Sequence, residues 1–231
     1  MEAVLEYAPL LLQGLAITVL VTVLGIALTV LVAFAAGLSG LSRRWYLRWP
    51  SYIFVEFIRG SGLLVQMFWF FFALPFLGIQ LHPLVAGVLA LGLNEGAYAA
   101  EIVRGTIRSR PKGQVEASIA LGMSPTQRLW RILIPQSIPA MLPSFGNVMV
   151  DLLKNTSLVS LVTVADLTWR AFNARTVTGA TVELFLTILV VYYLLSLTIG
   201  WVTRMLERRF ALDRKAKILA RTSLLPGVKA S

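Results

Sequence analysis

The chain has 231 residues, of which 57% are hydrophobic and 14% are charged, whereas about a quarter of the residues of a soluble domain are charged. Together with a mean hydropathy of +0.77, this composition excludes an ordinary soluble domain and predicts an all-α membrane protein. The formal net charge is +10 and the chain has no cysteine, which excludes disulfides and thiolate metal sites.

Five apolar stretches are long enough to cross a bilayer as helices. The first, residues 15–34, is a run of twenty residues without a charge, and about 20 apolar residues span the hydrocarbon core. We expect it to be retained, because Glu2 and Glu6 stand where a signal peptide has basic residues. The other predicted spans are approximately residues 53–72, 84–103, 132–153 and 184–202.

A weaker apolar patch, residues 157–164, follows the fourth span. It is too short to cross the membrane and rich in Ser and Thr, which predicts a short re-entrant or interfacial helix. No internal repeat or low-complexity segment interrupts the chain. We therefore predict one membrane domain at residues 10–210, with an external N-terminal segment at 1–9 and a cytoplasmic tail at 211–231.

The basic residues lie mainly beside alternate ends of the predicted spans. Seventeen of the 21 Lys and Arg residues follow spans one, three and five, whereas only Lys154, Arg170 and Arg175 lie on the other side, with Arg59 within or near span two. The positive-inside rule therefore places the N-terminus outside and the C-terminus in the cytoplasm. Because the charges are divided among short loops, they do not predict nucleic-acid binding.

A polar insert at residues 114–127 separates spans three and four. Residues 114–121 can form two helical turns, and Gly122 can adopt the left-handed conformation that ends a helix. Ser124 can cap a second helix, with Pro125 at its first position and Gln127 placed for a capping box. The pattern predicts a compact cytoplasmic projection that docks on a soluble partner, although a solvated connecting loop is also compatible with it.

The spacing of this insert resembles the EAA loop of ABC-importer permeases. Residues 116–118 match its Glu-Ala-Ala, Gly122 matches its glycine, and residues 132–135 match its terminal Ile-x-Leu-Pro. Ser118 replaces the second alanine and Ile134 replaces the leucine. Residues 57–66, 96–105 and 153–158 further resemble the polar amino-acid branch of the family, which is histidine/glutamine permease-like, and the similarity covers residues 10–210.

This resemblance implies a type I ABC-importer (MetI-like) permease with five transmembrane helices. Its cytoplasmic coupling helix would lie in a loop at about residues 104–135 and fit a groove on an ATPase subunit, which moves it during transport. The residues implied in ATPase coupling are Glu116, Ala117, Ser118, Gly122 and Pro125.

Polar residues inside or beside the spans form a second group, because charge at bilayer depth is costly and needs a protein-lined or aqueous environment. Those predicted to line a substrate pathway are Gln66, Asn94, Glu95, Lys154, Asn155 and Thr156. We expect residues 154–157 just beyond a span end on the external side, where they contact the solute or its binding protein, or cap the short helix that follows.

Other residues within the spans are predicted to have structural roles, or are compatible with either a structural role or a role in gating. The spacing of Glu56 and Arg59 predicts an ion pair on one helix face, and Glu101 one turn from Arg104 is predicted to be structural. We expect the fourth span to be broken around Pro143 and Gly146, which either form a gate or only shape helix packing.

The chain has no phosphate-binding loop of the G-x-x-x-x-G-K-S/T type and no residue cluster with metal-ligand spacing. We therefore expect no catalytic residue, no metal and no cofactor in this chain, with ATP bound by a partner subunit. An ion-coupled secondary amino-acid transporter is the alternative, although five spans do not divide into two equal repeats. A structural membrane subunit is a third reading.

The resemblance implies a subunit of the bacterial cytoplasmic (inner) membrane that assembles with several partners. These are an ABC ATPase, a second permease chain in a homo- or heterodimer, an extracytoplasmic solute-binding protein and membrane lipids. Residues 72–78 and 86–94 resemble those of permeases for ectoine and hydroxyectoine, which are compatible solutes derived from an amino acid.

Overall fold

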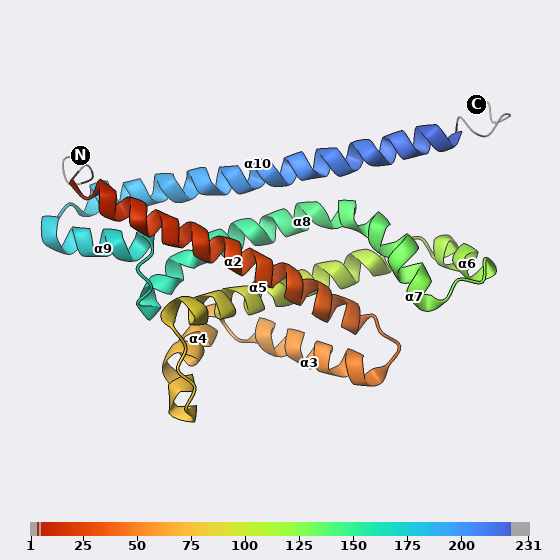
Figure 1. Cartoon of the computed structure of the whole chain (residues 1–231), viewed down its shortest axis with the longest axis horizontal. Helices are drawn as coiled ribbons and strands as arrows, with labels where there is room; N and C mark the ends of the chain where they lie inside the picture. The colour runs from red at the N-terminus through yellow and green to blue at the C-terminus, as the bar shows by residue number, and fades with distance from the viewer. Residues whose placement is uncertain (1–3, 5, 223–231) are drawn as a thin grey trace.

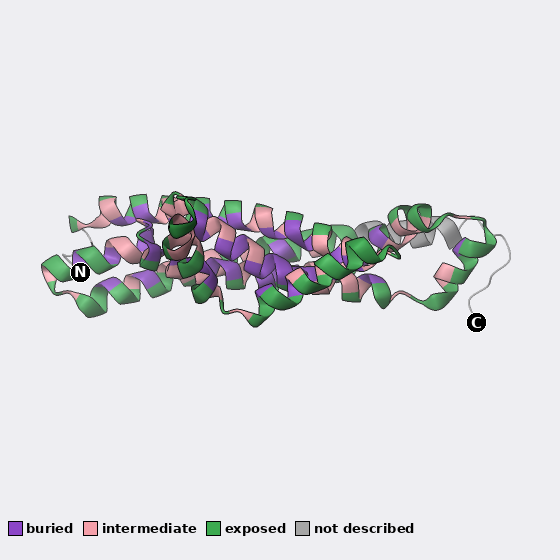
Figure 2. Ribbon diagram, turned by 90° about the horizontal axis from the view of Figure 1, so that it is seen from below, coloured by how far each residue is buried: buried purple, intermediate pink, exposed green. Residues whose placement is uncertain are grey.

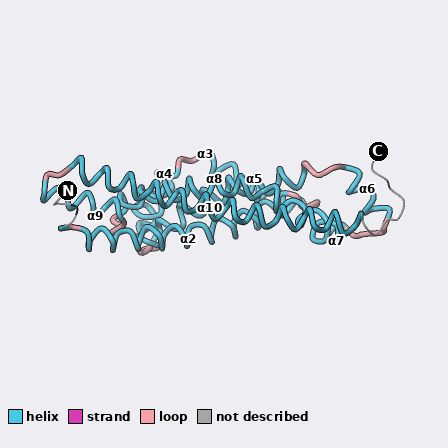
Figure 3. The backbone as a smooth tube through the Cα atoms, turned by 90° about the horizontal axis from the view of Figure 1, so that it is seen from above, coloured by secondary structure: helices cyan, strands magenta, loops and turns pink. Residues whose placement is uncertain are grey.

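The computed structural model describes residue 4 and residues 6–222, with only the backbone described for 211–222. Its regular structure is entirely helical over these residues, which confirms the all-α prediction (Figures 1 and 3). In chain order the elements are α2 (Ala8–Gly40), α3 (Trp45–Gly60), α4 (Leu63–Phe68), the π-helix η1 (Trp69–Ala73), the 3₁₀ helix η2 (Leu74–Leu77), α5 (Pro83–Arg108), α6 (Lys112–Ala120), α7 (Pro125–Arg128), the π-helix η3 (Leu129–Leu133), α8 (Ile134–Asn155), the 3₁₀ helix η4 (Thr156–Val162), α9 (Leu167–Thr178) and α10 (Thr181–Thr222).

Helices α2 and α5 make the most extensive helix contact of the bundle. Two glycines of α5 permit their close approach: a Cβ on Gly92 would lie 2.6 Å from Leu28, and a Cβ on Gly96 would lie 2.7 Å from Val32. The contacting residue numbers rise together along both helices, so the two run in the same direction. Small residues at such spacing are typical of packed membrane helices.

The predicted second span at 53–72 is not one straight helix. The chain bends by 101° between α3 and the segment at residues 63–77, and α4, η1 and η2 project sideways from the bundle (Figure 1). Gly60 and Gly62 flank Ser61, whose backbone is extended. Apolar residues on both sides of the Arg59-Gly60-Ser61-Gly62 run hid the break, because glycine and serine are compatible with both a helix and a turn.

Helix α8 is continuous, so the predicted break around Pro143 and Gly146 is wrong. Pro135, Pro139 and Pro143 are four residues apart, so the backbone groups that they leave unpaired lie along one side of the helix. The change of helix type lies instead at Asn155, where α8 passes into the buried 3₁₀ helix η4.

The start of η4 lies at half the depth of the bundle and not beyond a span end. A Cβ on Gly25 would lie 3.2 Å from Leu152, and Gly25 is close to the midpoint of α2. Residues 154–157 are therefore level with the middle of α2, which corrects their predicted external position. Because Thr156, Val159 and Val162 are buried, η4 packs inside the bundle, and the chain bends by 53° between the segment that ends with η4 and α9.

Helix α9 packs against the beginning of α2, and α10 returns along the bundle (Figure 1). Buried residues are concentrated along the central part of the bundle (Figure 2). Two helices, α2 and α10, are long and apolar enough to span a membrane alone, and up to four spans are found if each bent pair counts as one. Five spans therefore remain a prediction, because that number is reached only if α5 also crosses the membrane.

The predicted terminal segments fall partly outside the described residues. Residues 1–3 and 5 of the N-terminal segment and residues 223–231 of the predicted tail are not described, whereas 211–222 continue α10. The beginning of α2 and the end of α10 lie at opposite ends of the long axis, and α6 and α7 lie at the same end as the end of α10 (Figure 1).

Candidate functional site

The insert between α5 and α8 forms two short helices joined by a tight reversal. Helix α6 begins at Lys112, two residues before the predicted start, and ends at Ala120. Gly122 has φ +70°, its N–H donates to the carbonyl of Ile119 at 2.9 Å, and the N–H of Met123 donates to that of Ser118 at 3.0 Å. This pair of hydrogen bonds is the Schellman arrangement and confirms the predicted left-handed cap.

The second helix begins with the predicted capping box. The N–H of Gln127 donates to Ser124 Oγ at 3.3 Å, and the N–H of Ser124 donates to Gln127 Oε1 at 3.0 Å. From α7 the helical path continues through η3 into α8. The reversal is therefore joined to a long helix of the bundle without an intervening loop.

The two faces of α6 differ in exposure. Ser118 is buried, and its Oγ donates to the carbonyl of Val115 at 2.6 Å, whereas Glu116, Ala117, Gly122 and Pro125 are exposed. Ile119 and Leu121 are 56% and 78% exposed. Large apolar side chains grouped at the tip of a projection are typical of a surface that a partner covers. Of the five predicted coupling residues, only Ser118 faces inward. We refer to residues 112–128 as the coupling element.

Two of the predicted pathway residues meet between α4 and α5. Asn94 Nδ2 donates to Gln66 Oε1 at 3.3 Å, and both side chains are buried. Gln66 Nε2 also donates to the carbonyls of Ile58 at 2.7 Å and Ser61 at 3.0 Å. Because these carbonyls lie where α3 ends, Gln66 stabilises the break as well as contacting Asn94.

A second polar pair joins α5 to the end of α8. Asn155 Nδ2 donates to Glu95 Oε1 at 3.0 Å, and Glu95 is 6% exposed. Adjacent residues on a helix point in directions about 100° apart, so Asn94 and Glu95 serve different neighbours. The predicted pathway residues therefore form two separate pairs and not one continuous lining.

Lys154 and Thr156 have different surroundings. The side chains of Lys154 and Asp151 are each 61% exposed and form an ion pair at 3.7 Å. Thr156 is buried and its Oγ1 donates to the carbonyl of Leu153 at 2.7 Å. Asp151 was missed in the sequence, although its position three residues before Lys154 is a signal that could have identified it.

A buried cluster at the start of α9 was also missed. Asp166 is 0% exposed, caps α9 by accepting from the N–H of Trp169 at 2.9 Å, and accepts from Tyr192 Oη at 3.5 Å. The N–H of Leu167 donates to Thr18 Oγ1 at 3.1 Å. These contacts tie α2, α9 and α10 together, which indicates a structural role.

Two pairs of charged residues within the spans have different outcomes. Glu101, which we predicted to be structural, forms an ion pair with Arg104 on α5. Glu56 and Arg59 do not pair; instead the Arg59 guanidinium lies 5.1 Å from the ring centroid of Tyr98. The aromatic ring of the neighbouring helix offers a cation–π contact that the spacing within α3 could not indicate. Among the described residues, no group of three or more potential metal ligands occurs.

The hydrogen bonds of Asn94 and Gln66 predict different effects when each residue is replaced by leucine. Asn94→Leu is expected to lower uptake in reconstituted vesicles with little loss of assembled protein, because only one hydrogen bond of about 1 kcal/mol is removed. Gln66→Leu is expected to reduce the amount of folded protein as well, since it removes the hydrogen bonds from Gln66 Nε2 to the carbonyls of Ile58 and Ser61 at the end of α3. Size-exclusion yield and solute uptake measure the two effects, and equal yields with equal uptake would contradict the assigned roles.

The fold is an all-helical bundle that carries a compact projection, the coupling element, at one end (Figure 1). Residues 25–212 match the family described as "Binding-protein-dependent transport system inner membrane component", and the chain belongs to this family. It is 41% identical over 201 residues to the "Probable amino-acid ABC transporter permease protein y4tF" of Sinorhizobium fredii, with 84% of each chain covered. It is 33% identical to the "Glutamine transport system permease protein GlnP" of Escherichia coli, covering 90% of this chain and 96% of that one.

Solved structures agree with the family. A chain of the "Crystal structure of an amino acid ABC transporter with histidines" is 34% identical, with a TM-score of 0.82 and coverage of 89% of this chain and 96% of that chain. A chain of the inward-facing MetNI methionine ABC transporter is 19% identical with a TM-score of 0.76 over 89% and 98% of the two chains, and shows the fold alone. The predicted type I ABC-importer permease fold is confirmed.

Proposed function

We propose that this chain is the permease subunit of a binding-protein-dependent ABC importer for an amino acid or an amino-acid derivative. The single observation that carries the proposal is the exposed, doubly capped reversal at Gly122, which continues through η3 into α8. The names of the relatives support an amino-acid solute, because they describe amino-acid and glutamine permeases. The relatives give no support to the ion-coupled alternative.

The coupling element supports a separate ATPase as the source of energy. In this proposal ATP is bound by that subunit, the chain itself holds no cofactor, and a solute-binding protein delivers the solute from outside. The position of the coupling element at the same end as the end of α10 (Figure 1) supports a bacterial inner-membrane orientation with the N-terminus outside and the C-terminus in the cytoplasm.

A second permease chain is part of the proposal because of a charged pair at bilayer depth. Asp151 and Lys154 are both 61% exposed, yet they flank Leu152, which packs beside the midpoint of α2. Exposing such charges to lipid costs at least about 2.5 kcal/mol each. A second chain, identical or paralogous, would enclose these side chains in an aqueous pathway between two bundles.

The proposed solute is a polar amino acid or a related compatible solute such as ectoine or hydroxyectoine. The test is uptake by vesicles that contain the complete importer, with glutamine, histidine and ectoine as competing solutes and the binding protein titrated with each. Uptake that needs both ATP and the binding protein supports the proposal. Uptake driven by an ion gradient without either component would support the secondary transporter.

Charge reversal at Glu116 tests the coupling contact. Glu116 is exposed on α6, and like charges across an interface can cost several kcal/mol. We expect Glu116→Lys to insert normally but to retain at least about tenfold less ATPase on purification. Glu116→Gln is the matched control and should have a smaller effect. Equal ATPase retention by both variants would show that the charge of Glu116 does not contribute to the contact with the ATPase.

A further inference from the structure

The end of the bundle that carries the coupling element contains a basic cavity. It has a volume of about 990 Å³ and lies where the end of α2, the end of α5 and the coupling element meet. Its lining includes six cationic side chains and one carboxylate, that of Glu116. The cationic residues are Arg43, Arg44, Arg108, Arg110, Lys112 and Arg128.

These cations are not neutralised within the described part of the chain. The ion pairs found there are Glu101 with Arg104 and Asp151 with Lys154, and neither lines the cavity. Arg110 donates to backbone carbonyls, and the buried Nε of Arg128 has no hydrogen-bond partner. Six like charges around one volume repel one another, so an anion in the cavity would stabilise the arrangement.

The apolar part of the cavity lining favours an amphiphilic anion over a small soluble anion. Leu41, Leu47, Leu133 and Trp130 also line the cavity. Trp130 is 58% exposed, and tryptophan is enriched at the level of lipid headgroups. A free phosphate could pair with the arginines but would leave this apolar surface uncovered.

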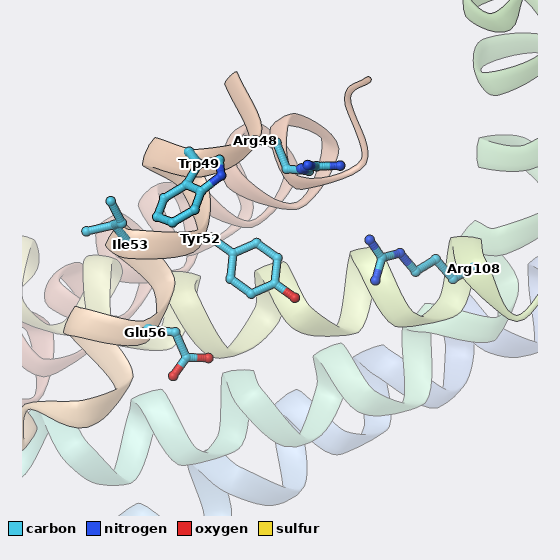
Figure 4. A pocket seen from close by; sticks show the side chains of 6 residues that line it. All are labelled: Arg48, Trp49, Tyr52, Ile53, Glu56 and Arg108. Atoms are coloured by element: carbon cyan, nitrogen blue, oxygen red, sulfur yellow. The ribbon is translucent and has the colours of Figure 1, made fainter. Parts of the chain in front are cut away.

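A smaller cavity of about 490 Å³ adjoins the first, because Arg108 lines both. Trp49, Tyr52 and Ile53 of α3 border it together with Arg48 and Glu56, and Arg108 extends from α5 on the opposite side (Figure 4). The exposed fractions of Trp49 and Ile53 are 60% and 59%. Exposed apolar side chains therefore lie next to the basic cavity along α3, where a glycerol backbone and acyl chains could cover them.

We propose that the basic cavity binds the phosphodiester headgroup of an anionic phospholipid from the cytoplasmic leaflet. This inference rests on the orientation given under the proposed function, since basic pockets between membrane helices on that side bind anionic headgroups. The bound lipid connects the loop after α2, through Arg43 and Arg44, to the coupling element, through Lys112 and Arg128. It would hold the coupling element against the bundle while the partner ATPase moves it.

The test measures lipid binding by the complete importer separately from its transport. The purified complex is placed in nanodiscs of phosphatidylcholine with increasing phosphatidylglycerol, and bound phosphatidylglycerol is quantified by native mass spectrometry. Arg128→Gln is compared with Arg131→Gln, because Arg131 belongs to the neighbouring η3, is exposed and does not line the cavity. Arg44→Gln is a second variant, on the opposite wall.

We expect Arg128→Gln and Arg44→Gln each to weaken phosphatidylglycerol binding about fivefold, the factor for one basic residue at an anionic surface, and Arg131→Gln to leave it unchanged. Added inorganic phosphate should not displace the lipid. Equal losses for all three variants would show general attraction and overturn the site, and displacement by phosphate would assign the cavity to a soluble anion. Lost ATPase with retained lipid would show that the cavity receives the partner protein instead. ATPase retention by the unmodified complex tests the proposed function independently.

Discussion

Replacing Gly122 by valine is expected to abolish ATP-driven uptake while the protein still inserts in the membrane. Gly122 has φ +70°, a conformation that costs a β-branched residue about 1–2 kcal/mol or more. No atom lies within 4 Å of a Cβ placed there, so the effect comes from the backbone and not from a clash. The reversal between α6 and α7 would open and α7 would change its direction. We therefore expect the ATPase subunit to be lost on purification.

Gly113→Val is the matched control for this prediction. Gly113 lies in α6 of the same coupling element, a Cβ there meets open space, and its φ is not in the left-handed region. We expect this variant to retain the ATPase. Gly122→Asn should retain more ATPase than Gly122→Val, because asparagine tolerates the left-handed conformation. If Gly122→Val and Gly113→Val behaved alike, the backbone requirement at the reversal would be disproved.

Replacing Gly96 by valine is expected to prevent stable folding of the permease. A Cβ on Gly96 would lie 2.7 Å from Val32 and 3.4 Å from the carbonyl oxygen of Thr29. Helices α2 and α5 would have to separate along their main contact, and overpacking of this kind costs about 1–3 kcal/mol or more. The expected result is a lower thermal unfolding midpoint and a large loss of monodisperse protein in detergent.

Gly105→Val provides the comparison on the same helix. Nothing lies within 4 Å of a Cβ on Gly105, so helix propensity changes equally while the contact with α2 is preserved. We expect its unfolding midpoint to remain near that of the unmodified chain. A similar loss in both variants would mean that glycine flexibility in α5, and not close packing on α2, sets the stability.

The local conformation of the coupling element was predictable because it depends on near neighbours. A left-handed glycine and a capping box are decided by residues within a few positions of one another. Gly122, Ser124 and Gln127 therefore adopt the expected conformations. The start of α6 differed by two residues, as is usual at the frayed end of a short helix.

The bend after α3 and the continuity of α8 were not predictable in the same way. The apolar residues on both sides of Ser61 predicted a single span, and prolines suggested a break in α8. The bend depends on Gln66, whose side chain donates to carbonyls five and eight residues away. Whether a glycine or proline interrupts a helix is decided by such hydrogen bonds and by neighbouring helices.

The membrane class, the family and the conformation of the docking reversal could all be predicted from the sequence, because hydropathy and capping act over short distances along the chain. The contact of Glu95 with Asn155, the depth of Lys154 in the bundle and the six basic residues around one cavity became visible only in the folded chain. The Glu95–Asn155 contact and the cavity join residues from different helices. They depend on how α2, α5, α8 and the coupling element pack together, which no local pattern specifies.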